Sequence, residues 1–535
     1  SPSRICGTLS PMPPSRSAAL HRRGGDASPD HDAIVVGAGH NGLVAAAYLA
    51  RAGMRTLLVE ARPTIGGTAA SEEFAGATVN ICNCDHLTFR TTPVMEELGL
   101  AEHGLRYLDV EPGQHNRAWG SVDRGWSLHH DLDATLDSLG SSFPHEVDGY
   151  RRYAETAMPA VRMIFEAAAE PPTVRSLTRL ALRRRLQGVP TILRWSRRSA
   201  ADVLRSYFSD EAVSGPAALT GPMVWGISPE LPGSGLGALT HAMRHVAKVG
   251  RPVGGSGQVP AALSAAFLAA GGVLRTGSPV DTILCDGVRV RGVALVGGEE
   301  ITAPVVVSAC NPHDTFLRWL KDPPAAAADL VRRWSAIPHH DGYESKIDAV
   351  LSDPPVLRHG GGGLGPTTVI APSLAEIDRG AQLMVDGAVL ERPGFLVNVP
   401  TLLDPTMAPA ALHVLSLEAL FTPFGLRGGW TASDEPRRWL ELLAELCEPG
   451  LLDSIVDWRV MTPDVYERDF HLPAGHATSF GGGPLAAFRS PDPELTRYET
   501  AVDGLYLTGA ATFPGAGVWG ASGRNCAAVV LEQHA

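Results

Sequence analysis

The 535 residues are too many for one ordinary domain and too apolar for a disordered chain, because 44% are hydrophobic and only 19% are charged. The 57 acidic residues outnumber the 45 basic ones, and this balance argues against a protein that coats nucleic acid. Seven cysteines are odd in number and too sparse for a disulfide scaffold, so we expect a reducing, cytoplasmic compartment.

Residues 1–30 have the composition of a disordered tail. They are rich in Ser, Pro and Arg, contain no acid before Asp26 and lack the apolar core of a signal peptide. An organelle transit peptide and a start-site extension would both have this composition, and the two interpretations stay open.

The strongest signal follows residue 32, where a short buried strand (33–36), a glycine-rich loop and a helical pattern (43–52) come in succession. In such a loop the first glycine permits a tight turn, the second lets a pyrophosphate approach the backbone, and the third allows close packing of helix and strand. The free N–H groups of the helix N-terminus face the phosphates. The loop residues are Gly37, Gly39, His40, Asn41 and Gly42.

A second predicted strand (55–59) ends at an acid that suits the same ligand. This acid, Glu60, lies eighteen residues beyond Gly42, where a carboxylate can accept hydrogen bonds from a ribose. The Arg-x-x-x-Gly-Gly sequence that follows resembles flavoproteins with the glutathione-reductase-like and amine-oxidase-like folds, so we expect FAD. The residues expected at the cofactor here are Glu60, Ala61, Arg62, Gly66, Gly67 and Thr68.

The C-terminal segment is expected to complete the cofactor site. Residues 504–510 form a strand pattern that ends in glycine, and residues 514–520 lead into a helix that continues to about residue 531. In the FAD folds that this segment resembles, the helix N-terminus faces the flavin pyrimidine ring and its dipole stabilises the anionic reduced flavin. The resemblance implies cofactor contacts from Val280, Gly509, Ala510, Gly517, Val518 and Trp519.

The chain as a whole is similar to the phytoene dehydrogenase-like branch of FAD oxidoreductases, which contains the carotenoid desaturases. The matching stretches are residues 37–53, 226–243, 254–283, 306–316, 399–425 and 504–529. This resemblance implies an α/β fold, with a Rossmann-like FAD-binding domain and an inserted α+β substrate domain. The expected segments are a tail (1–30), three parts of the FAD-binding domain (31–110, 246–320 and 481–535), a largely helical cap (111–245) and a substrate domain with a mixed or antiparallel sheet (321–480).

The expected function is an FAD-dependent desaturase or dehydrogenase, in which flavin N5 takes a hydride from a C–H bond of a lipophilic or conjugated small molecule. No second complete dinucleotide pattern and no CxxxxC occur, so electrons should pass to an acceptor such as oxygen or a quinone. The alternatives are an amine oxidase, a redox-neutral flavin-dependent isomerase and an escort-type binding protein on the same fold. An aromatic cage for an amine is not evident, since Trp519 is the only aromatic residue after Phe513.

An unusually polar segment follows the Gly-Gly motif and supplies the candidate catalytic residues. It contains Asn80, Asn83, Asp85 and His86. On the functional interpretation His86 is the acid/base, because an imidazole pKa near 6.5 suits proton transfer, and Asp85 or an asparagine orients it or the substrate. On the alternative interpretation these side chains form a polar network that holds a loop. The first interpretation implies a substrate more polar than a carotenoid at its reacting end.

Residues 172–205 carry nine arginines and one acid. With the leucines between them, they could form a basic amphipathic surface that docks on anionic lipid, or a solvated helical face. We therefore expect a cytoplasmic enzyme, with peripheral membrane contact as one interpretation of this segment. No HExxH spacing occurs, and no catalytic metal is expected.

Overall fold

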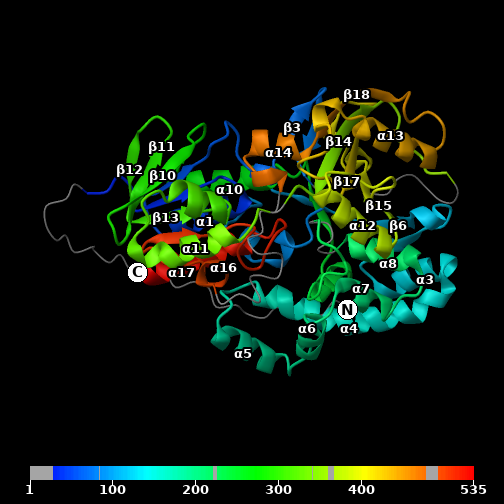
Figure 1. The fold of residues 1–535 in the computed structure, drawn as a ribbon, viewed down its shortest axis with the longest axis horizontal. Helices are drawn as coiled ribbons and strands as arrows, with labels where there is room; N and C mark the ends of the chain where they lie inside the picture. The colour runs from blue at the N-terminus through cyan, green and yellow to red at the C-terminus, as the bar shows by residue number, and fades with distance from the viewer. Residues whose placement is uncertain are drawn as a thin grey trace.

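The computed structural model describes residues 28–82, 85–220, 226–339, 341–358, 367–476 and 492–534. Five described strands form a parallel sheet in the order β19-β13-β1-β2-β9. Their bounds are β1 (Ala33–Val36), β2 (Thr56–Val59), β9 (Val273–Arg275), β13 (Val305–Ser308) and β19 (Leu505–Leu507). Strands from distant parts of the sequence thus lie side by side, which is the Rossmann-like α/β fold that the sequence predicts (Figure 1).

Both faces of this sheet are covered, which explains why its strands are continuous apolar runs. The helices α1 (His40–Arg51), α10 (Gln258–Ala269) and α17 (Ala521–His534) contribute to the core on one face. The small antiparallel sheet of β10 (Val280–Cys285), β11 (Val290–Leu295) and β12 (Glu300–Thr302) covers the other face with α11 (Ala328–Ala336). Most of the expected tail lies outside the described residues, but Asp30 already binds the backbone and hydroxyl of Thr302.

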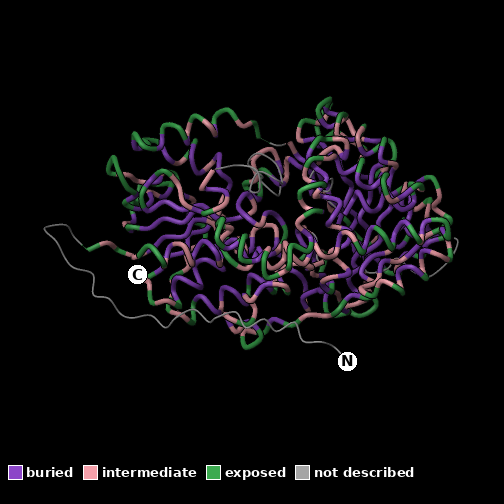
Figure 2. The backbone as a smooth tube through the Cα atoms, turned by 90° about the horizontal axis from the view of Figure 1, so that it is seen from below, coloured by how far each residue is buried: buried purple, intermediate pink, exposed green. Residues whose placement is uncertain are grey.

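The second sheet has seven described strands in the order β18-β14-β17-β16-β15-β6-β7, and only the pair β15–β6 is parallel. One face packs on α13 (Glu435–Leu446), and the other packs on the helical segment (Figure 2). The strands are β6 (Gln114–Ala118), β7 (Trp126–Leu128), β14 (Glu344–Leu351), β15 (Thr368–Ala371), β16 (Phe395–Asn398), β17 (His413–Leu420) and β18 (Ile455–Met461).

The helical segment lies below the seven-stranded sheet in Figure 1. It contains α3 (Leu132–Ser142), α4 (Val147–Ala167), α5 (Val174–Arg183), α6 (Val189–Trp195), α7 (Ala200–Arg205), α8 (Glu211–Leu219) and α9 (Leu239–Ala242). The remaining described α-helices are α2 (Val94–Glu97), α12 (Leu374–Val385), α14 (Pro463–Phe470) and α16 (Pro493–Thr496).

Two short antiparallel pairs lie between the two large sheets. The hairpin of β3 (Ser71–Phe74) and β4 (Ala77–Asn80) follows the Gly-Gly motif, and β5 (Tyr107–Asp109) pairs with β8 (Gly250–Pro252). The polar segment around Asp85 begins where β4 ends, so its side chains lie near both large sheets. The segment boundaries at residues 30, 110, 245, 320 and 480 stay predictions.

Candidate functional site

The glycine loop connects β1 to α1, and its glycines serve different physical purposes. Gly37 has a φ of +98°, which an L side chain rarely adopts. A Cβ on Gly42 would lie 1.9 Å from the Gly37 carbonyl oxygen, so this glycine is required for close packing of helix and strand. A Cβ on Gly39, in contrast, would meet no described protein atom within 4 Å. The loop is therefore open to a ligand at the position where the sequence predicts a pyrophosphate.

The end of β2 lies against this loop. Glu60 is buried, and its carboxylate accepts hydrogen bonds from the N–H groups of Ala38 (2.7 Å) and Arg62 (2.9 Å), with Ala61 in the turn between. A carboxylate has four lone-pair positions, so two remain for ribose hydroxyls. The Glu60 carbonyl accepts from the Ser278 N–H (2.8 Å), which brings the start of β10, with Val280, to the same edge.

The Gly-Gly motif packs directly on the glycine loop. The Gly66 N–H donates to the Ala38 carbonyl (2.8 Å), and a Cβ on Gly67 would lie 3.5 Å from the Gly39 Cα. Thr68 lies in the short 3-10 helix that follows, Gly67–Ala69. The predicted cofactor residues of this segment are thus brought together around one open space.

The C-terminal loop reaches the same place from the other end of the chain. The helices α1 and α17 pack so closely that a Cβ on Gly523 would lie 2.2 Å from the Asn41 carbonyl oxygen. The Ser522 hydroxyl in the first turn of α17 accepts a hydrogen bond from the Gly509 N–H (3.0 Å), at the turn that also contains Ala510. Two helix N-termini therefore lie side by side, which suits a dinucleotide with a flavin at one end.

Two orphaned polar atoms support the fit to FAD. Among the described residues, neither His40 Nε2 nor Arg62 Nη1 has a hydrogen-bonding partner, although both atoms are buried. Burial lowers the pKa of His40 to about 4, although a bond to the Gly517 backbone opposes this shift, so the ring is neutral near pH 7. Leaving such atoms unpaired costs about 1 to 3 kcal/mol each, and a polar ligand in the open space would remove this cost. The residues present therefore fit the cofactor.

Not every predicted contact of the C-terminal loop points its side chain toward this space. The Trp519 indole N–H donates to the Ala516 carbonyl (2.9 Å), and its ring packs on Phe165 of α4 with centroids 5.7 Å apart. The Val518 carbonyl accepts from the Thr88 hydroxyl (2.8 Å). The side chain of Trp519 thus has a packing role, and a contact of these two residues with the cofactor stays a prediction.

Asp85 and His86, the candidate catalytic residues, bind different partners in the structure. Both ring nitrogens of His86 are engaged by other residues: Nδ1 lies 2.9 Å from the Tyr107 hydroxyl, and Nε2 lies 2.6 Å from the Ser256 hydroxyl. Asp85 instead accepts from Arg251 Nε (2.6 Å) and from the Thr367 hydroxyl. The reason is tertiary: Arg251 is a stronger partner for a buried carboxylate than a neutral imidazole. Asn83 lies outside the described residues.

The surroundings of His86 suit a neutral, fixed side chain. It is 1% exposed, and burial together with the field of His40 lowers its pKa to about 3. An imidazole this weakly basic is a poor proton acceptor at neutral pH. A catalytic role for His86 stays a prediction, and its contacts favour the polar-network interpretation.

A buried charged group that the sequence did not indicate lies beside this network. The Lys346 ammonium on β14 donates to the Asn80 carbonyl (2.7 Å) and pairs with Asp348. Glu418 on β17 lies opposite Lys346 in the sheet register, and burial raises the pKa of its carboxyl well above the usual value. These residues are far apart in sequence, so no motif could have revealed them.

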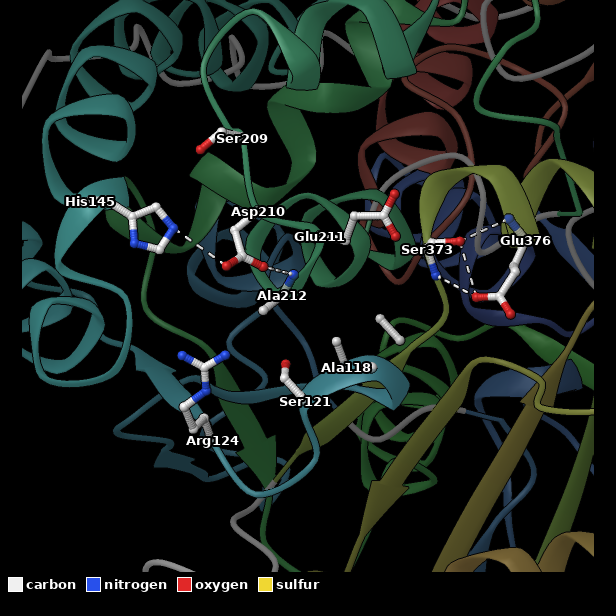
Figure 3. A pocket seen from close by; sticks show the side chains of 12 residues that line it. Ala118, Ser121, Arg124, His145, Ser209, Asp210, Glu211, Ala212, Ser373 and Glu376 are labelled. Atoms are coloured by element: carbon white, nitrogen blue, oxygen red, sulfur yellow. Dashed lines mark hydrogen bonds and ion pairs between the residues drawn. The ribbon is translucent and has the colours of Figure 1, made fainter.

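A cleft in the helical segment is separate from this site (Figure 3). Some of its polar groups bind within the chain: Asp210 accepts from the Ala212 N–H (2.9 Å) at the start of α8, and Ser373 forms a capping box with Glu376 at the start of α12. Among the described residues, no group of three or more His, Cys, Asp or Glu side chains is placed to hold a metal ion. None of the described helices is both long and apolar enough to cross a membrane.

Comparison with known proteins agrees with this geometry. Residues 42–343, more than half of the chain, match the family "Flavin containing amine oxidoreductase". The chain is 28% identical to the rat pyridine nucleotide-disulfide oxidoreductase domain-containing protein 2, over 94% of each chain. It is 26% identical to the lycopene-forming phytoene desaturase of a Paracoccus species, over 94% of this chain and 98% of that one. The structure of cyclohexylamine oxidase from Brevibacterium oxydans has the same fold (TM-score 0.57, 18% identity, 95% and 100% covered).

These matches and the site define a flavin-dependent oxidoreductase. The chain belongs to the flavin-containing amine oxidoreductase family. Its cofactor is FAD, and it acts with a small-molecule substrate and an electron acceptor.

Proposed function

We propose that the protein is a desaturase or dehydrogenase that introduces a double bond into a lipophilic or conjugated small molecule. The observation that carries this proposal is the disposition of the aromatic side chains in the C-terminal loop. Phe513 and Trp519 are 1% and 5% exposed and pack against helix α4 and its neighbours, so this loop presents no aromatic cage for an amine. The similarity to a phytoene desaturase over nearly the whole chain supports the same choice.

The residues of the chain have binding and orienting roles in this reaction. The glycine loop and Glu60 would hold the pyrophosphate and ribose, and the N-terminus of α17 would stabilise negative charge on the flavin. Bound FAD supplies the hydride acceptor. We propose oxygen or a quinone as the electron acceptor. The glycines of residues 254–257 pack on the β3–β4 hairpin and leave no space for a second nucleotide, because Cβ atoms on Gly255 and Gly257 would lie 2.8 Å from atoms of Ser71.

The test is anaerobic reduction of the purified protein by candidate substrates. A desaturase substrate should bleach the absorption band of oxidised flavin at about 450 nm. The product should have one more double bond, which mass spectrometry detects as a loss of two hydrogens. Bleaching by primary amines, with release of an aldehyde, would favour the amine oxidase alternative. Product of unchanged mass would favour the isomerase.

We also propose that helices α5 and α6 contact anionic lipid. Leu182, Leu186 and Leu193 are 66%, 53% and 56% exposed, and the neighbouring Arg185 and Arg194 are exposed as well. Four other arginines of this segment pair with carboxylates, Arg179 with Glu170, Arg183 and Arg184 with Glu166, and Arg205 with Glu230. The apolar side chains, more than the total positive charge, therefore distinguish this surface from an ordinary solvated face.

A further inference from the structure

A cluster of buried polar side chains, several of them unpaired, lies beside Asp85 and Arg251. On β6, the Gln114 side-chain amide donates to Asn116 Oδ1 (2.6 Å), and both residues are fully buried. Among the described residues, Gln114 Oε1 and Asn116 Nδ2 have no partner. Exchanging O and N in both amides would again leave one acceptor and one donor unpaired, so this pair always presents both to a neighbour.

Two further residues, His241 and Arg244, have polar atoms that are unpartnered within the described structure, and they are linked to β6 through its neighbours. Asn116 lies opposite Trp126 in the sheet, and the Trp126 ring packs on His241, whose Nε2 is buried and unpartnered among the described residues. A Cβ on Gly113, the residue before β6, would lie 3.7 Å from Arg244 Cδ. Arg244 Nε is likewise buried without a partner in the described part of the chain.

The charges of this cluster do not balance. Asp85 is the carboxylate whose field acts on Arg244, but its oxygens bind Arg251 and Thr367. Within the described residues Arg244 forms no ion pair of its own, and the nearby His241 is neutral because burial lowers its pKa well below 6.5. Two guanidinium groups thus share one carboxylate in a poorly solvated place. Arg244 is partly exposed, its Nε atom is buried, and it has no ion-pair partner among the described residues, so an anion from outside the chain would be favoured here.

The surroundings define the rest of the ligand. The rings of Trp126, Tyr150 and Tyr153 lie within 5.8 to 6.3 Å of the His241 ring, measured between centroids. His86, the next residue after Asp85, is close enough to His40 of the glycine loop for the field of His40 to lower the pKa of His86. The cluster is therefore apolar around its charged centre and near the dinucleotide loop.

We propose that Arg244, with Asn116 and Gln114, binds the carboxylate end of the substrate, so that the substrate is an organic acid with an apolar or aromatic skeleton. This inference rests on the proposed oxidoreductase function and makes the substrate class specific. Arg244 and Asn116 supply donors to the carboxylate. Gln114 Oε1 would accept a hydrogen bond from a polar hydrogen of the ligand that lies close to its carboxylate.

The test is isothermal titration calorimetry of the FAD-loaded protein with 3-phenylpropanoate, 4-phenylbutanoate and their neutral amides. We expect at least one acid to bind ten times or more tightly than its amide. Arg244→Gln should remove this preference while FAD content stays unchanged, whereas the exposed Arg152→Gln on α4 should leave it intact. Gln114→Glu adds a carboxylate to the protein that can pair with Arg244. This variant should therefore have a higher Tm and should no longer bind the acids.

The proposal is overturned if no acid binds better than its amide, or if Arg244→Gln and Gln114→Glu both keep the preference. Calorimetry measures binding and does not depend on turnover. Failure of the proposed function would instead appear as a protein that lacks FAD, or whose flavin no substrate bleaches.

Discussion

Two glycines of the same loop illustrate how one residue type serves packing at one position and ligand binding at another. Gly42 cannot carry a side chain because the backbone of Gly37 lies in the way. Gly39 has an ordinary extended backbone (φ −66°, ψ 168°) and open space beside it. The sequence pattern predicts packing for the third glycine and cofactor approach for the second, and the contacts of the two positions agree with these roles.

This difference predicts that Gly39→Ala affects FAD binding but not the stability of the fold. The extended backbone accepts alanine without strain, so the Tm of the FAD-free protein should stay within a few degrees of the wild type. FAD content should fall at least tenfold, because the methyl group occupies the space that the pyrophosphate needs. Gly120→Ala, which also meets no described atom within 4 Å, is the control and should retain FAD. Full FAD content in Gly39→Ala would contradict the assignment of the loop.

His86 gives a second prediction at this scale, on the pH dependence of stability. Its pKa is about 3 in the folded protein and near 6.5 when unfolded, so the unfolded state binds more protons between these values. Stability from this group is therefore complete above pH 6.5 and falls as the pH drops toward 3, by up to about 1.4 kcal/mol per pH unit. Urea unfolding of His86→Gln at pH 7 and pH 5 should show a smaller loss than the wild type. The control His103→Gln should show the wild-type loss; equal losses in all three proteins would refute the assignment.

Individual residues were predictable only where a motif constrains them. Gly37, Gly42 and Glu60 lie where the sequence pattern places them, because the spacing of a strand, a loop and a helix is local. The partners of Asp85 and His86 were not predictable, since Arg251 and Ser256 come from positions about 170 residues away and no pattern links them. An orienting role for Asp85 toward the substrate therefore stays a prediction.

Among the elements, the strongest local patterns gave the best boundaries. The predicted strand at 33–36 coincides with β1, and the strand at 55–59 differs from β2 by one residue. The helix predicted from residue 43 begins at His40, because His40, Asn41 and Gly42 already adopt its first turn. The seven-stranded sheet was harder to predict in detail: it pairs β6 with β15, which lie about 250 residues apart.

Helix α5 and the turn after it carry a prediction about membrane binding. Leu182→Gln with Leu186→Gln should reduce binding to anionic phosphatidylserine vesicles at least fivefold, because two exposed apolar side chains no longer insert. Val456→Gln on β18, a valine that is 60% exposed, is the control and should bind as the wild type does. Vesicle co-sedimentation at low and high salt measures the apolar and the electrostatic contributions to binding. Wild-type protein that never sediments with vesicles would support the solvated-face interpretation.

At the scale of the whole molecule, a chain of ion pairs joins the two large sheets. Arg62 next to the cofactor segment binds Glu72 (3.0 Å), Glu72 binds Arg459 on β18 (2.9 Å), and Arg459 binds Asp348 (3.2 Å). Asp348 pairs with Lys346, which binds the end of β4. This series of ion pairs connects the residues around the glycine loop with the sheet that carries Glu418.

Breaking this chain should cost more than breaking an exposed pair. Arg459→Leu leaves Glu72 and the buried Asp348 with fewer partners, so we expect a loss of about 3 kcal/mol in the free energy of unfolding. Arg437→Leu removes an exposed i,i+4 pair with Glu441 and should cost less than about 1 kcal/mol. Denaturant unfolding of both variants measures the difference. Equal losses would show that the chain is not a stabilising connection.

The most direct test of the account as a whole is the nucleotide content of the purified protein. The two helix N-termini, the open space at Gly39 and the unpaired atoms of His40 and Arg62 all fit one FAD per chain. Denaturation followed by chromatography should release FAD in equimolar amount and no nicotinamide nucleotide. A colourless protein that FAD cannot reconstitute, or one that releases NAD in place of FAD, would contradict the central claim.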